Sequence, residues 1–171
     1  MKFNKTEIIQ KFIESIETEL AVLKKAAKNT ADYATDSENK PENKYDTRGL
    51  EASYLAGAQA QRVAEMQDVL LCFRSTAIKK FHSDRSSTSG LKNENVIAIS
   101  ALVGVFLNEK IQNLLIMPLG GGQTIKYQEN TIQVVTPNSP LGKALIGHSV
   151  GDNITIVAGG ANREYEIASI Q

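Results

Sequence analysis

The chain has 171 residues, enough for one domain or two small ones, and its 19 lysines and arginines equal its 19 aspartates and glutamates. This balanced charge indicates no particular class of partner, and a single cysteine, Cys72, excludes an intramolecular disulfide or a cysteine-rich zinc site. No stretch approaches the ~18 apolar residues of a membrane span, and the N-terminus lacks the apolar run of a signal peptide. We therefore expect a cytoplasmic protein that does not contact membranes.

Two long helices are predicted in the N-terminal half. Apolar or small residues recur every three or four positions from Thr6 to about Asp32, and again from Gly49 to about Ile78. Both stripes are narrow enough for a coiled-coil seam, and the short connection favours an antiparallel hairpin. The stripe positions are Ile9, Phe12, Ile16, Leu20, Leu23, Ala27 and Thr30, then Ala52, Ala56, Gln59, Val63, Met66, Leu70, Phe73 and Ala77.

The segment between these helices, TDSENKPENKYD, is acidic. Its carboxylates are those of Asp36, Glu38, Glu42 and Asp46, and Pro41 prevents the first helix from continuing through it. The residues alone leave two interpretations open. The segment is either a solvated polar turn, in which Asp46 or Thr47 caps the second helix, or a set of acids displayed for a function.

The C-terminal half is predicted to be a separate sheet domain. Residues 81–95 are polar and serine-rich, as in a linker, and after them the apolar period changes to two. One strand is predicted from Ile97 to Leu107, and five more strand-like segments follow it. Between two of these, Ser139 as N-cap, Pro140 and a terminating Gly147 predict a short helix. The fold class is therefore α+β, with a small antiparallel sheet and one short helix against it.

Several short motifs follow one another in the last 40 residues: Ser139-Pro140-Leu141-Gly142, Ala144-Leu145, Gly147, Val150-Gly151-Asp152 and Arg163-Glu164-Tyr165-Glu166-Ile167. In these motifs the chain resembles the C-terminal domain of bacterial Gre-type transcript cleavage factors, which is FKBP-like. The two-part architecture is similar too. The resemblance implies a coiled-coil hairpin over residues 1–80 with an acidic tip near 32–46, a linker over 81–95, and an FKBP-like domain over 96–171.

The resemblance also implies a function. In Gre factors the hairpin enters the secondary channel of RNA polymerase, and acids at its tip help to hold a second Mg²⁺ where the 3′ end of a backtracked transcript is cleaved. On this basis Asp36, Glu38 and Glu42 are the expected catalytic acids, with Asp36 and Glu38 facing the metal. The expected polymerase-binding residues are Leu141, Val150, Gly151 and Asp152.

The same resemblance implies what the chain does not do alone. Mg²⁺ would be shared with the polymerase active site and not bound by the isolated protein. Nascent RNA would be contacted only indirectly, and the chain would act as a monomer. It would not be an enzyme, because the catalytic metals and the substrate belong to the polymerase.

The tip departs from the family motif, which is approximately Asn-Gly-Asp-Leu-(Ser/Lys)-Glu-Asn-Ala-Glu-Tyr. Asp36-Ser37-Glu38-Asn39 lacks one residue between acid and serine, and Glu42-Asn43-Lys44-Tyr45 offers a second alignment. A non-cleaving channel factor that regulates initiation or pausing therefore stays open as the alternative. A peptidyl-prolyl isomerase is disfavoured, because such a pocket is lined by aromatic residues and the second half has few. A coiled-coil interaction protein unconnected with transcription is the third hypothesis.

Overall fold

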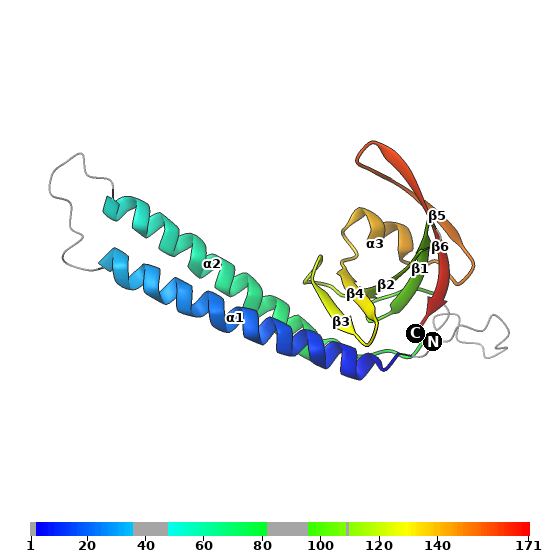
Figure 1. Ribbon diagram of the computed structural model, residues 1–171, viewed down its shortest axis with the longest axis horizontal. Coiled ribbons are helices and arrows are strands. Elements are labelled where there is room, and N and C mark those ends of the chain that lie inside the picture. The colour runs from blue at the N-terminus through cyan, green and yellow to red at the C-terminus, as the bar shows by residue number, and fades with distance from the viewer. Residues whose placement is uncertain (1–2, 36–47, 82–95, 109) are drawn as a thin grey trace. The chain divides into compact units, whose positions relative to one another are not determined.

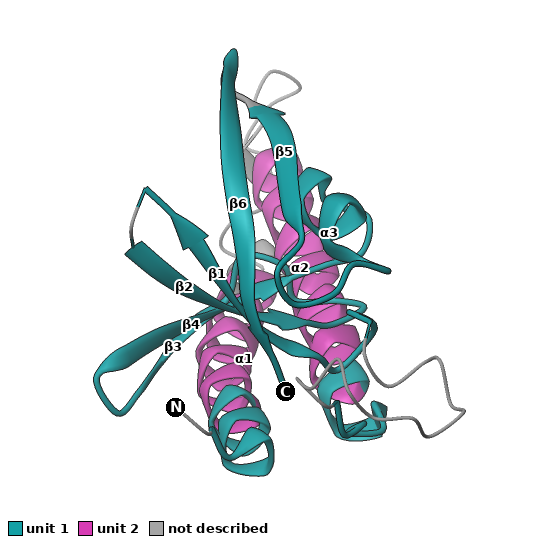
Figure 2. Cartoon of the chain, turned by 90° about the vertical axis from the view of Figure 1, so that its right-hand side faces the viewer, with its two compact units in different colours: residues 1–12, 72–171 teal, residues 13–71 magenta. Residues whose placement is uncertain are grey.

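The computed structural model describes residues 3–35, 48–81, 96–108 and 110–171 (Figure 1). The chain forms two compact units, one of residues 1–12 with 72–171 and the other of residues 13–71 (Figure 2). Most of the predicted linker lies outside the described residues, so the predicted domain boundaries stay a prediction. Within the described ranges, no helix combines the length and the apolar composition needed to cross a membrane.

The two long helices form close to where the apolar stripes predict them. Helix α1 runs from Lys5 to Thr35 and helix α2 from Arg48 to Ser75. In the second unit they lie side by side and run in opposite directions, as expected for a hairpin (Figure 1). The stripe positions are the less exposed ones along each helix, and Ile16, Leu20 and Ala52 are buried. Apolar periodicity therefore positions the seam of this hairpin.

An ion pair between described side chains also joins the helices. Arg62 Nη2 of α2 lies 3.9 Å from Glu19 Oε1 of α1, and both side chains are largely exposed. Exposed pairs of this kind contribute about 0–1 kcal/mol to stability. The apolar seam, and not this pair, accounts for the hairpin.

Gln59 is a polar residue within the α2 stripe, and its side-chain oxygen Oε1 is buried without a hydrogen-bond partner among the described residues. Leaving such an acceptor unsatisfied costs about 1–3 kcal/mol. We expect Gln59→Met, which keeps the side-chain length and removes the unpaired oxygen, to raise the free energy of unfolding by about 1 kcal/mol. The measurement is urea denaturation followed by circular dichroism at the helical band.

Gln61 provides the matched control for this substitution. It lies on the same helix but is exposed, and its Nε2 donates to Glu65 Oε1 at 2.9 Å. Gln61→Met should change the free energy of unfolding by less than about 0.5 kcal/mol. A loss of stability in Gln59→Met would contradict the interpretation that the buried Gln59 oxygen destabilises the helix pair.

The first unit is built on a six-stranded sheet with the strand order β3-β4-β2-β1-β6-β5. All neighbouring strands are antiparallel except β2 and β4, which are parallel because β3 carries the chain back before pairing with β4. The α+β class with one short helix is confirmed. The strands are β1 (Leu102–Leu107), β2 (Lys110–Ile116), β3 (Thr124–Tyr127), β4 (Asn130–Val135), β5 (Asn153–Ala158) and β6 (Ala161–Ile170), and the short helix is α3 (Pro140–Leu145).

The strand predicted to begin at Ile97 begins at Leu102 instead. Ser100 has a φ of 70°, a left-handed conformation outside the range of a regular strand, and its buried Oγ accepts a hydrogen bond from Lys79 N at 2.9 Å. Ile97 is fully buried, but its backbone N–H donates to His148 O and its carbonyl accepts from Gly147 N, both at 2.9 Å. In this segment the alternating apolar pattern reflects the burial of side chains and not the pairing of a strand.

Both faces of the central strands are buried: Leu102, Leu115, Ile132 and Val134 lie on one face, and the main hydrophobic cluster lies on the other. Alternate residues of the central strands meet there, and Leu145 of α3 and Ile97 complete the cluster. Partly buried Leu141 and Val150 pack against it from α3 and from the loop that follows. The residues of this cluster are Ile97, Ala101, Val103, Val105, Leu114, Ile116, Val135, Leu145, Ile154, Tyr165, Ile167 and Ile170.

The first turns of α1 belong to the same unit as the sheet and are tied to it by polar contacts. Tyr127 Oη of β3 donates to Glu7 Oε2 at 2.5 Å, and this hydrogen bond raises the pKa of Tyr127. Lys5 Nζ donates to the carbonyl oxygens of Ser100, at 3.0 Å, and of Lys79, and partial burial lowers the pKa of Lys5 to about 8. The start of α1 is therefore a part of the sheet unit.

Candidate functional site

The three predicted catalytic acids, Asp36, Glu38 and Glu42, lie outside the described residues. Helix α1 ends at Thr35 and helix α2 begins at Arg48. The acids thus fall in the segment that connects the two helices, at one end of the hairpin. Their predicted roles, including the metal-facing role of Asp36 and Glu38, stay predictions.

The predicted polymerase-binding residues lie in and after α3, whose start follows from its sequence. Ser139 is the N-cap, with extended φ and ψ of −69° and 155°, and its Oγ accepts a hydrogen bond from Gly142 N at 3.0 Å. The same hydroxyl donates to Thr136 O at 2.7 Å, which ties the helix to the end of β4. Pro140 occupies the first helical position, where its missing N–H costs nothing.

Leu141 contributes to a groove as well as to the core. The groove has a volume of about 470 Å³ and lies between α3, the glycine loop before β3, and the end of β4. Its apolar lining and its position beside Leu141 suit an apolar side chain of a partner protein. The lining residues are Gly121, Gly122, Gln133, Val134, Val135, Thr136, Ser139, Pro140, Leu141 and Ile156.

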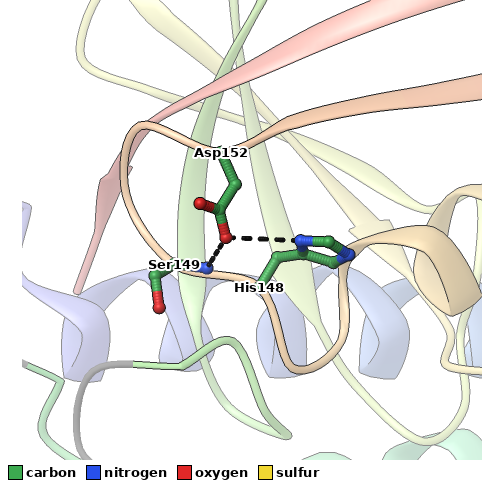
Figure 3. Close-up of polar contacts among 3 residues, drawn as sticks. All are labelled: His148, Ser149 and Asp152. Carbon is green, nitrogen blue, oxygen red and sulfur yellow. Dashed lines mark hydrogen bonds and ion pairs between the residues drawn. The ribbon is translucent and has the colours of Figure 1, made fainter.

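The loop after α3 is shaped by one carboxylate (Figure 3). Asp152 Oδ2 accepts a hydrogen bond from Ser149 N at 2.8 Å and lies 3.3 Å from His148 Nδ1. The side chains of His148 and Asp152 are 45% and 37% exposed, so both are accessible to a partner. The contact between the His148 imidazole and the Asp152 carboxylate is a second side-chain link across this loop.

A β-bulge sets the direction in which this loop leaves the sheet. Gly151 has a φ of 85° and its N–H donates to Ile167 O at 2.7 Å, while Ile167 N donates to Asp152 O at 2.9 Å. Two residues of one strand thus face one residue of β6, which is the pattern of a bulge with a left-handed glycine. Only glycine adopts this φ without strain, so Gly151 has a structural role beside its predicted binding role.

The structure separates the predicted polymerase-binding set into two parts. Leu141 lines the groove, whereas Val150, Gly151 and Asp152 form the loop between α3 and β5 and do not line it. Both parts rest on the same core cluster, through Leu141 and Val150. The groove residues Gly121, Gly122 and Ile156 could not be found from local sequence, because strand pairing alone brings them beside α3.

Comparison with known proteins gives this surface and the hairpin a context. A family model described as "Transcription elongation factor, GreA/GreB, C-term" matches residues 117–171, which include α3, the loop and β6. Transcription elongation factor GreA of Sinorhizobium medicae is 30% identical over 125 residues, which cover 70% of each chain. GreA of Brucella canis is 28% identical over 125 residues, with the same coverage.

Among solved structures, the GreA factor homolog 1 (Gfh1) of Thermus thermophilus is similar with a TM-score of 0.35 and 18% identity, over 93% of this chain and 94% of that chain. The sequence identity to GreA, over more than two thirds of both chains, extends well beyond the C-terminal motifs. The chain belongs to the GreA/GreB family of transcription elongation factors.

Proposed function

We propose that this protein binds RNA polymerase through its sheet unit and acts through the acids that connect α1 and α2, promoting cleavage of the transcript 3′ end in backtracked complexes. One observation carries the proposal. This chain belongs to the GreA/GreB family, and the acids Asp36, Glu38 and Glu42 lie in the segment that connects its two long antiparallel helices. At ~1.5 Å per residue, helices of 31 and 28 residues extend for about 45 and 40 Å. Such a hairpin can carry carboxylates into a narrow channel.

The side chains in the connecting segment suit this chemistry. Asp36, Glu38 and Glu42 offer hard oxygen ligands of the kind that Mg²⁺ prefers. A second Mg²⁺ at the polymerase active site would supply Lewis acidity and activated water. The carboxylates of this chain would orient that site and complete its ligand set, and the chain would contribute no other reactive group.

The sheet unit supplies the docking surface. The apolar groove beside Leu141 would take an apolar side chain of the polymerase. The exposed side chains of His148 and Asp152, in the loop that follows α3, would offer polar contacts. An apolar anchor in a groove with polar groups around it is the usual arrangement of an energetically dominant contact. Contact with the nascent RNA would be indirect, through the polymerase active site.

Leu141→Ser tests the docking surface. We expect it to weaken binding to RNA polymerase core enzyme at least tenfold, about 1.4 kcal/mol, because the side chain that lines the groove is shortened and made polar. The affinity can be measured by competition against a fluorescently labelled copy of the parent protein. Melting temperatures of both proteins show whether the variant is folded at the assay temperature.

Ile111→Ser is the matched control for Leu141→Ser. Ile111 is 51% exposed on β2 and lines no part of the groove, so its polymerase affinity should equal that of the parent. Equal affinities of Leu141→Ser and the parent, with both folded, would contradict docking through this groove.

The alternative function is that of a channel factor that does not promote cleavage but modulates initiation or pausing. The departure of residues 36–45 from the usual tip motif favours it. Both functions share the docking surface and the position of the tip. Addition of the protein to a backtracked elongation complex, followed by sizing of the RNA, separates them, because only the first produces shortened 3′ ends.

A further inference from the structure

Strand β5 ends the sheet on one side, and its outer edge faces no other strand in the described part of the chain. Its residues, Asn153–Ala158, include no charged residue and no proline. The strand at the opposite end, β3, has four residues and carries Lys126. Charged residues and short length are common protections of a sheet edge, so β3 is protected and β5 is not.

Strands β5 and β6 also extend beyond the rest of the sheet (Figure 1). Strand β6 pairs with β1 only from Glu166 to Ile170, whereas its first half pairs with β5 alone. This arm is therefore two-stranded, and two-stranded ribbons gain stability from a third strand. The β6 edge of the arm carries Arg163 and Glu164, which leaves the β5 edge as its uncharged side.

The hydrogen-bond pattern shows which backbone groups of β5 point outward. The bond from Ile167 N to Asp152 O places Asp152 in a hydrogen-bonded position toward β6, and such positions alternate along an antiparallel pair. The turn at Gly159 and Gly160, with φ of 63° and 79°, is of the two-residue type that makes Ala158 and Ala161 a hydrogen-bonded pair, which gives the same alternation. The outward groups are therefore those of Asn153, Thr155 and Val157.

This outward set is self-complementary. If two copies pair antiparallel with Thr155 on the two-fold axis, Thr155 faces Thr155 and each Asn153 faces Val157. The three outward residues of each strand then form hydrogen-bonded pairs, giving about six backbone hydrogen bonds between copies. All three side chains are exposed, and Val157 is 71% exposed.

Charge does not oppose this pairing. Glu164 lies opposite Thr155 on the neighbouring strand, so two copies of Glu164 would stand three strand spacings apart, about 14 Å. This separation exceeds the Debye length of about 8 Å at physiological ionic strength. No like charges face one another across the new strand pair itself.

We propose that the outer edge of β5 pairs with the same edge of a second copy of this chain, in antiparallel register centred on Thr155, to form a dimer with one continuous sheet. An interface of one six-residue strand from each copy is below the size of stable complexes, so the dissociation constant is on the order of 0.1 mM. The dimer therefore forms only where the local concentration of the protein is high. This inference is independent of the proposed action on transcripts.

Disulfide trapping in the full chain tests the register. In a Cys72→Ser background, Thr155→Cys places two thiols in residues about 5.5 Å apart between Cα atoms, within the range of a disulfide. Val157→Cys is the control, because it is on the same exposed edge but its two copies are about 14 Å apart along the strand in this register. With oxidised glutathione at high protein concentration, Thr155→Cys should form covalent dimer at least roughly tenfold faster than Val157→Cys.

A second test measures the oligomeric state by sedimentation equilibrium at protein concentrations up to about 1 mM. The parent protein should dimerise, and Thr155→Lys should stay monomeric, because two ammonium groups would meet at the two-fold axis. Thr124→Lys, which adds the same charge at an exposed position on the opposite edge, should dimerise as the parent does. Equal trapping of the two cysteine variants, a monomeric parent, or dimerisation of Thr155→Lys would each overturn the proposal.

Discussion

Replacing both Asp36 and Glu38 by alanine is expected to lower the rate of factor-dependent transcript cleavage at least 100-fold, or roughly 2.7 kcal/mol of activation free energy. The reason is that carboxylate oxygens are the part of the tip that can complete the ligand set of a weakly held Mg²⁺. The rate is measured by adding the protein to a backtracked elongation complex and following the shortening of the labelled RNA with time.

The controls for this experiment are substitutions at neighbouring positions of the same segment. Ser37→Ala with Asn39→Ala changes the same segment without removing charge, and this double variant should cleave at the parent rate. Asp46→Ala should also leave cleavage unchanged if Asp46 serves as a helix cap. Full activity after loss of Asp36 and Glu38 would reject these two residues as the acting acids, and Glu42→Ala would then be the next variant.

Replacing Gly142 by alanine is expected to lower the free energy of unfolding of the sheet unit by about 3 kcal/mol. A Cβ at this position would lie 2.0 Å from the carbonyl oxygen of Thr136 and 2.8 Å from its carbon. Both are backbone atoms at the end of β4, so the strand end or the helix must shift. Such a shift would also strain the bonds between Ser139 Oγ and Thr136 O and between Gly142 N and Ser139 Oγ.

Gly57→Ala is the matched control for Gly142→Ala, because no atom of the described residues lies within 4 Å of the added Cβ and Gly57 is in the interior of α2. There the change should stabilise the helix by about 0.5–1 kcal/mol, since alanine loses less backbone entropy than glycine on folding. Urea denaturation of both variants gives the comparison. Equal stability of Gly142→Ala and the parent would show that α3 is not held against Thr136 as described.

The parts of the fold that follow from local sequence were predictable. Apolar periodicity predicts α1 and α2 to within a few residues at their ends, because a helix that packs along one side must repeat its apolar residues every three or four positions. The start of α3 was predictable from Ser139 and Pro140, since capping depends only on neighbouring backbone groups.

The parts that depend on strand pairing were not predictable. The segment from Ile97 to Ala101 alternates like a strand but is bent at Ser100 and bonds to the loop after α3. The parallel pairing of β2 with β4 depends on where β3 docks, for which no local pattern exists. For the same reason the sequence pointed to Leu141 but not to Gly121 or Ile156 as its companions in the groove.

The central claim is that the segment connecting α1 and α2 reaches the catalytic metal of RNA polymerase, and localised radical cleavage tests it most directly. Fe²⁺ replaces Mg²⁺ in the polymerase active site, and hydroxyl radicals generated there cut polypeptide close to the metal. With end-labelled protein bound to the polymerase, the account predicts cuts within residues 36–47 that disappear when a competing unlabelled copy is added. Absence of cuts in this segment, or cuts confined to the sheet unit, would contradict it.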